Sequence, residues 1–164
     1  TIEENLALAA GKGGWLSHVS RQEKEHFYEE LKLLDIGLEK RMSHPVGLLS
    51  GGQRQALTLL MATMNPPKLL LLDEHTAALD PKTAAKVLET TDMIVNRDHL
   101  TTIMITHNMK DAIAHGNRLI MLMDGKIILD IKGEEKKKLT VEDLLHQFEK
   151  ASGEEFANDR ALLS

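Results

Sequence analysis

Apolar residues recur every three or four positions in several stretches of the chain, a spacing that predicts helices with one buried face. The first of these helices begins at the capping box Ser20–Glu23 and ends near Gly37. A second follows Ser50 and stops before Pro66, and a third begins at Asp80, directly before a proline that favours a helix start. The predicted buried faces contain Phe27, Leu31, Leu34, Leu57, Leu60, Met61, Met64, Ala84, Leu88, Thr91 and Val95.

Between the second and third helices, the continuous apolar run Leu69–Leu72 is typical of a strand buried on both faces of a parallel sheet. Thr102–Thr106 predicts the next strand, and a short helix follows it as far as Gly116. Strand, helix, strand and helix in this order predict a right-handed parallel α/β unit. The predicted fold class is therefore α/β.

The last third of the chain predicts a β-hairpin and a terminal helix. Leu119–Met123 and Ile127–Ile131 flank the pair Asp124-Gly125, which suits a two-residue turn. The charged run Glu134–Lys138 is interpreted as a solvated loop, and Thr140–Asp143 resembles a capping box at the start of a helix. That helix is predicted to present Val141, Leu144, Leu145 and Phe148 on one face.

Composition narrows the class of protein. The chain has 164 residues, 42% hydrophobic and 27% charged, as expected of one soluble domain or of a domain with an appended lobe. Its 20 Lys and Arg against 25 Asp and Glu give a net charge of −5, which disfavours a dedicated nucleic-acid binder. The absence of cysteine excludes disulfides, cysteine-ligated zinc and cysteine nucleophiles. No apolar run approaches the roughly 18 residues of a membrane span.

The first candidate site is Ser50-Gly51-Gly52-Gln53 at the start of the second helix. The amides at a helix N-terminus and its positive end attract anions, and glycine lets a phosphate approach closely. An ordinary helix cap with a flexible entry accounts for these residues equally well. The tetrapeptide alone therefore leaves both interpretations open.

The other candidates follow strands or open a helix. Asp73 and Glu74 end the apolar strand, where α/β folds place ligands, and such carboxylates are suited to hold Mg²⁺ and to act as a general base. A solvated strand end is the common alternative. His107 follows the next strand and is suited to contact a phosphate or a catalytic water, although a lone histidine is usually structural or merely exposed. Asp80 by itself indicates only a helix start.

In this order and spacing, the four groups resemble the ATP-binding-cassette (ABC) ATPases. Leu49–Gln53 is similar to the family's signature motif, and Leu69–Glu74 to its Walker B strand with the catalytic glutamate. Ala78–Asp80 resembles the D-loop, and His107 the switch histidine. The resemblance covers nearly the whole chain.

The resemblance implies a partial ABC fold of the P-loop NTPase type in three parts. Residues 1–48 would form the helical subdomain, residues 49–134 the signature helix and the C-terminal part of the parallel-sheet core, and residues 135–164 a C-terminal helical extension. Residues 1–20 are expected to be partly helical, with a glycine-rich break within residues 11–14.

Some features depart from the family. His75 stands where the family often has Pro or Ala and is interpreted as a solvent-facing loop residue, and Ala77 stands where it often has Ser. Neither Gly11-Lys12 nor Gly125-Lys126 completes the P-loop pattern Gly-x-x-x-x-Gly-Lys-[Ser/Thr], and no Q-loop Gln or adenine-stacking strand can be placed. The family carries these elements upstream, and the chain begins at Thr1. We therefore expect a C-terminal fragment that does not bind ATP fully alone.

The resemblance also implies residue roles in a dimer. In the family, two nucleotide-binding domains sandwich each ATP between the P-loop of one and the signature of the other. Carried over to this chain, Ser50, Gly51 and Gly52 would contact the γ-phosphate held by the partner. Gln53 would lie nearby, and Asp80 would cross the dimer interface.

The remaining implied roles concern hydrolysis. Asp73 would help to hold Mg²⁺, Glu74 would orient and deprotonate the attacking water, and His107 would brace the γ-phosphate and that water. ATP and Mg²⁺ are the implied cofactors, and ATP hydrolysis is the implied activity of the parent protein.

The favoured function is the ATPase subunit of a membrane transporter, a bacterial-type importer for amino-acid-like substrates. The implied partners are a second nucleotide-binding domain, as a homodimer, and transmembrane permease subunits, and the implied location is cytoplasmic, peripheral on the inner face of the cell membrane. No nucleic-acid partner is expected. Exposed sheet edges invite pairing, so we expect the chain to self-associate.

Two alternatives stay open. ABC ATPases of DNA maintenance or of ribosomes often interrupt the domain with a coiled coil or duplicate it, and this sequence shows neither feature. Salt-dependent binding to DNA or ribosomes would favour that class. A short non-catalytic regulatory or interaction domain is the other alternative, which retention of both Glu74 and His107 makes less attractive.

Overall fold

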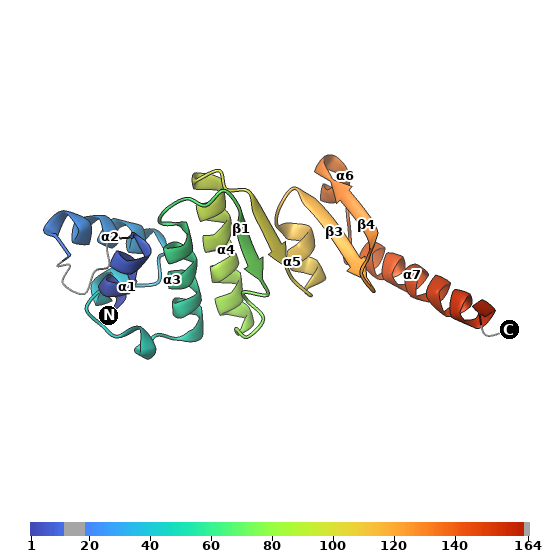
Figure 1. Ribbon diagram of the computed structural model, residues 1–164, viewed down its shortest axis with the longest axis horizontal. Coiled ribbons are helices and arrows are strands. Elements are labelled where there is room, and N and C mark those ends of the chain that lie inside the picture. Colours follow the sequence, from blue (N-terminus) through green and yellow to red (C-terminus); the bar gives the residue numbers. More distant parts are fainter. Residues whose placement is uncertain (12–18, 163–164) are drawn as a thin grey trace. The chain divides into compact units, whose positions relative to one another are not determined.

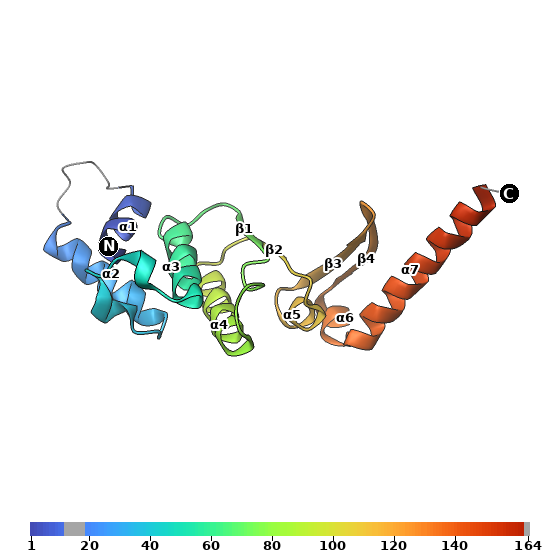
Figure 2. The same cartoon turned by 90° about the horizontal axis from the view of Figure 1, so that it is seen from below.

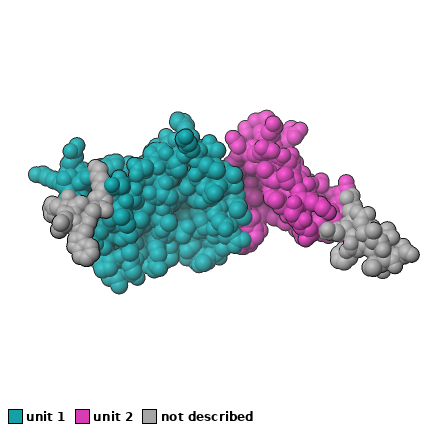
Figure 3. Space-filling view, viewed as in Figure 1, with its two compact units in different colours: residues 1–105 teal, residues 106–164 magenta. Residues whose placement is uncertain are grey.

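The computed structural model describes residues 1–11 and 19–162, with side chains as far as residue 153. The chain forms two compact units, residues 1–105 and residues 106–164 (Figure 3). Residues 12–18 lie outside the described residues. They include Gly13 and Gly14 of the expected break and Lys12 of the incomplete P-loop pattern. The three-part division of the ABC fold stays a prediction.

The first unit joins a helical lobe to a helix-covered parallel sheet. Capping boxes start α2 at Ser20 and α3 at Ser50, and Asp80 caps α4, so these three helix starts are confirmed. The predicted first helix ends four residues before Gly37, which begins a 3-10 turn with a φ of 75°. The elements (Figures 1 and 2) are α1 (Ile2–Ala9), α2 (Arg21–Leu33), η1 (Leu38–Arg41), η2 (Val46–Leu48), α3 (Gly51–Thr63), β1 (Leu70–Asp73), α4 (Pro81–Arg97) and β2 (Thr102–Ile105).

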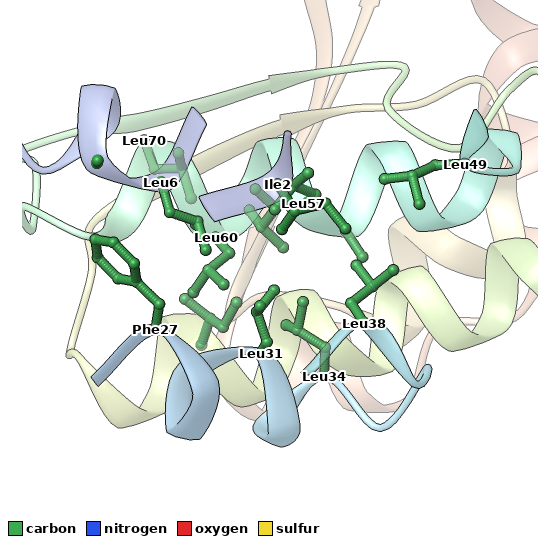
Figure 4. Packing of buried hydrophobic residues seen from close by; sticks show 14 of the residues in the cluster. Ile2, Leu6, Phe27, Leu31, Leu34, Leu38, Leu49, Leu57, Leu60 and Leu70 are labelled. Atoms are coloured by element: carbon green, nitrogen blue, oxygen red, sulfur yellow. The ribbon is translucent and has the colours of Figure 1, made fainter. Parts of the chain in front are cut away.

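The core of this unit lies where α1, α2 and α3 meet the sheet (Figure 4). The apolar stripe predicted for α2 is buried at Phe27, Leu31 and Leu34, because it faces α1 and α3. Leu57 and Leu60 of α3 are also buried, as predicted. Burial of apolar area is the main stabilising term for such a lobe. The labelled core residues of Figure 4 are Ile2, Leu6, Phe27, Leu31, Leu34, Leu38, Leu49, Leu57, Leu60 and Leu70.

β1 and β2 pair in parallel, as predicted, with Leu70 opposite Thr102 and Asp73 opposite Ile105. The expected burial of both sheet faces is wrong for the described chain. Leu70 and Leu72 are buried in the core, whereas Leu71 is 66% and Ile105 is 55% exposed. Side chains alternate between faces along a strand, and among the described residues of the first unit, 1–11 and 19–105, nothing covers the outer face.

The second unit is built on the predicted β-hairpin. Its turn residues Asp124 and Gly125 have φ values of 48° and 76°, and two positive φ values are what a type I′ hairpin turn requires. The antiparallel pairing contains a register shift between Met121 and Leu122. The elements are α5 (Met109–Ala114), β3 (Arg118–Met123), β4 (Lys126–Lys132), α6 (Gly133–Lys137) and α7 (Val141–Leu162).

The charged run after the hairpin is exposed, as expected, except at Lys136, but it is a short helix and not a loop. It forms α6, and Lys136 is 3% exposed, with its Nζ donating hydrogen bonds to the carbonyl oxygens of Ile113 and His115. The last carbonyls of a helix lack partners within the helix, so a lysine that reaches the end of α5 satisfies them. Burial lowers the pKa of Lys136.

The capping box expected at the start of α7 is confirmed, because the Asp143 amide donates to the Thr140 hydroxyl and the Asp143 carboxylate accepts from the Thr140 amide. The single apolar face predicted for α7 is wrong in part. Leu144 is 1% exposed, whereas Leu145 and Phe148 are each 45% exposed. Over the described residues, every helix is too short or too polar to cross a bilayer.

Candidate functional site

The signature-like turn is held by its own side chains. The Ser50 hydroxyl accepts from the Gln53 amide at 3.3 Å, and the Gln53 Oε1 accepts from the Ser50 amide at 3.2 Å. The Gln53 Nε2 donates to the carbonyl oxygen of Ile36 at 3.4 Å, which ties this turn to the chain after α2. Both ends of the Gln53 side chain are therefore engaged in supporting the turn.

Gly51 and Gly52 occupy the first two positions of α3, whose amides have no acceptor within the helix. Ser50 and Gly51 are exposed, so this positive helix end is open to an anion. Gly52 is buried, and a Cβ added to it would lie 2.0 Å from the Thr83 Cγ2. The second glycine thus has a packing role between α3 and α4 that sequence reasoning did not assign.

Asp80 lies beside this turn. Its carboxylate accepts from the Thr83 amide at 3.1 Å and caps α4, and a Cβ on Gly51 would come within 3.2 Å of the Leu79 Cδ2. The structure therefore brings together the signature-like and D-loop-like segments. Hydrogen bonds from the Thr83 side chain, and then from its amide, hold the pKa of Asp80 below its ordinary value.

This shift gives Asp80 a testable pH dependence. The folded-state pKa is the lower one, so the stabilisation by the charged cap is present above the unfolded-state pKa, about 4, and is lost as pH falls through the folded-state pKa. Asp80→Asn keeps a capping oxygen without the charge, so its stability deficit relative to wild type should shrink over that acid range. Thermal unfolding of both proteins across pH 2–7 measures the deficit, and a constant difference would contradict the assignment.

Asp73 and Glu74 lie at the carboxyl end of β1, and both are exposed. The Glu74 amide donates to the carbonyl oxygen of Ile105 at 3.0 Å, which extends the pairing with β2. The Glu74 carbonyl accepts from the Ala77 amide at 3.0 Å, and Glu74 has a φ of 43°. A left-handed conformation is costly for a residue with a Cβ, so the Glu74 backbone is held by its surroundings.

The environment of His75, which directly follows Glu74, differs from the sequence-based expectation. His75 was expected to face solvent, but it is half-buried, and its Nε2 lies 3.2 Å from the Thr91 Oγ1 on α4. The sequence placed Thr91 correctly on the buried face of α4. No sequence signal linked two residues that lie 16 positions apart.

His107 follows β2 by two residues and is exposed in the second unit. The next helix, α5, is capped by Asn108, whose side-chain oxygen accepts hydrogen bonds from the Lys110 and Asp111 amides. The Asn108 amide in turn donates to the Thr106 hydroxyl at 3.0 Å. These hydrogen bonds join the residues on either side of His107, and its role stays a prediction.

The described carboxylates fit a magnesium ion only if other groups, such as substrate phosphates and water, supply most of its ligands. In the part of the chain with described side chains, no three His, Asp or Glu residues converge as a metal site. Mg²⁺ binds oxygen, keeps several waters and commonly takes one or two protein carboxylates together with substrate phosphates. The exposed Asp73 carboxylate fits such a single protein ligand.

Known proteins with similar sequences are ABC transporter components. Residues 1–77 match the family model described as ABC transporter. The tyrosine transport ATP-binding protein of Clostridioides difficile (strain R20291) is 48% identical over 153 residues, which cover 92% of this chain and 61% of that protein. The methionine import ATP-binding protein MetN of Streptococcus pyogenes serotype M3 (strain ATCC BAA-595 / MGAS315) is 38% identical over 147 residues, which cover 87% of this chain and 40% of that protein. The chain spans only part of each relative.

Solved structures of ABC transporter cassettes are similar in fold to this chain. A bacterial ABC transporter cassette solved as a dimer has a TM-score of 0.62 and 30% identity, covering 80% of this chain and 56% of the other. A second ATP-binding cassette of an ABC transporter has a TM-score of 0.66 at 23% identity, covering 83% and 56%, and supports the fold alone. The predicted α/β fold of the ABC ATPase type is confirmed. This chain belongs to the ABC transporter family of ATP-binding domains.

Proposed function

We propose that this chain supplies the signature and Walker B part of an ATPase subunit that drives an ABC transporter. The observation that carries the proposal is the open N-terminus of α3, where Ser50 caps the helix and the Gly51 and Gly52 amides lack helical acceptors. A positive helix end of this kind fits the γ-phosphate of an ATP bound by a partner domain.

The proposed hydrolytic residues stand at the end of β1 and after β2. Asp73 contributes one carboxylate ligand to Mg²⁺, and the Glu74 carboxylate takes a proton from the attacking water. His107 braces the γ-phosphate, and Asp80 crosses the dimer interface. Phosphoryl transfer depends mainly on positioning and charge stabilisation, which such residues supply together with Mg²⁺.

The proposed physiological setting follows the names of the relatives. One is named for tyrosine transport and one for methionine import, so we propose an importer of amino-acid-like substrates. Its ATPase subunits would form a homodimer, bind transmembrane permease subunits and lie on the cytoplasmic face of the membrane. Import of radiolabelled tyrosine and methionine by the reconstituted transporter tests the substrate class.

Calorimetry with Mg-ATP tests the proposed half-site. The 164 residues hold no complete P-loop pattern, so we expect neither saturable binding nor hydrolysis by this chain alone. The complete ATP-binding protein, meaning these residues together with the P-loop segment that the proposed function requires, should bind and hydrolyse ATP. Micromolar binding by the 164-residue chain would overturn the half-site proposal.

The uncovered face of the parallel sheet supports self-association of the chain. Leu71 is 66% exposed in β1, and Ile103 and Ile105 of β2 are 52% and 55% exposed. Sedimentation velocity should give an average mass that rises with concentration, and Leu71→Lys should abolish the rise. Leu48→Lys is the matched control, because Leu48 is 68% exposed in a 3-10 turn outside the sheet. A monomeric wild type at all concentrations would contradict the prediction.

A further inference from the structure

The hydrogen bond between His75 and Thr91 has a defined direction. The Thr91 hydroxyl has one proton to donate. Its Oγ1 lies 2.8 Å from the carbonyl oxygen of Val87, and a carbonyl oxygen can only accept a hydrogen bond. The hydroxyl therefore donates to Val87, and its oxygen accepts from the His75 Nε2 at 3.2 Å. His75 thus carries a proton on Nε2.

This bond fastens the loop after β1 to the middle of α4. Thr91 is 4% exposed and lies within a long helix, so its hydroxyl is a fixed point. His75 directly follows Glu74, which has the unfavourable φ of 43°. On its other side, Glu74 is fixed by the hydrogen bond of its amide to the Ile105 carbonyl oxygen. The strained residue is therefore held from the strand and from the helix.

We propose that His75 is a positioning residue, which holds the Glu74 carboxylate in place by anchoring its loop to Thr91. The proposal rests on the proposed function of Glu74 as the general base. Without the anchor, Glu74 is free to relax toward an ordinary backbone conformation, and its carboxylate leaves the position that β1 and the loop define.

Nuclear magnetic resonance of the 164-residue chain tests the anchor without any ATPase activity. The imidazole nitrogen shifts of His75 should report a proton on Nε2 that is hydrogen-bonded. His75→Ala and Thr91→Val should each speed hydrogen exchange of the Glu74 and Ala77 amides by about three- to tenfold, the effect of losing one hydrogen bond. Thr91→Ser keeps the hydroxyl acceptor and should exchange at the wild-type rate.

The consequence for hydrolysis is tested in the complete ATP-binding protein. His75→Ala should lower kcat about tenfold while KM for ATP stays unchanged, because a displaced base slows the chemical step and not nucleotide binding. His75→Gln offers a side-chain amide donor in place of the imidazole N–H and should restore kcat.

The outcomes separate the anchor from the function of Glu74. Unchanged amide exchange in folded His75→Ala and Thr91→Val chains would overturn the anchor, as would failure of His75→Gln to restore kcat. If exchange accelerates while Glu74→Gln hydrolyses ATP at the wild-type rate, the role of Glu74 fails and the anchor remains as a feature of the fold.

Discussion

Glu74→Gln is expected to reduce ATP hydrolysis by the complete ATP-binding protein about 10²–10⁴-fold, the usual contribution of a general base, while ATP binding persists. Glutamine has the size and shape of glutamate, but its amide does not take the proton of the attacking water. The backbone of Glu74 is held by bonds of its own amide and carbonyl, which the substitution keeps. Initial hydrolysis rates and equilibrium binding of Mg-ATP measure the two effects separately.

A matched control removes a carboxylate elsewhere. Glu142 is exposed in the first turn of α7, in the second unit, and Glu142→Gln makes the same chemical change in a different element of the chain. We expect that variant to hydrolyse ATP at the wild-type rate. Normal turnover by Glu74→Gln would show that another group activates the water, and loss of ATP binding would show that Glu74 contributes to nucleotide affinity.

Local signals account for most of what the sequence predicted correctly. A capping box involves residues three positions apart, so Ser20 and Ser50 mark helix starts without reference to the rest of the chain. The pair Asp124-Gly125 marks the hairpin turn in the same way, because it supplies two residues that tolerate positive φ. The order of the site motifs likewise predicted the family, which the relatives confirm.

The failures concern contacts between segments distant in sequence. Lys136 was placed in a solvated loop because charged runs usually are solvated, yet it reaches carbonyl oxygens 21 and 23 residues earlier. His75 contacts Thr91 across a loop and half of α4. The apolar run of β1 predicted burial on both faces, and the exposed side chain of Leu71 shows that apolar patterning predicts a preference for burial without specifying what covers the strand.

Gly52→Ala is expected to destabilise the first unit by about 1–3 kcal/mol, the usual cost of forcing extra volume into a packed interface. A Cβ at this position would lie 2.0 Å from the Thr83 Cγ2, so α3 and α4 must move apart or Thr83 must change rotamer. Replacing glycine with alanine within a helix usually stabilises by up to about 1 kcal/mol, which offsets only part of this cost. Urea unfolding of the 164-residue chain measures the net change.

A double-mutant cycle attributes that change to one methyl group. Thr83→Ser removes Cγ2 and keeps the hydroxyl and the amide that serve Asp80, so the Gly52→Ala/Thr83→Ser chain should recover most of the lost stability. Gly47→Ala is the control, because a Cβ there meets nothing within 4 Å. If Thr83→Ser gives no recovery, the contact with the Thr83 Cγ2 is not the source of the lost stability. Recovery would show that the packing of α3 on α4 requires glycine at position 52.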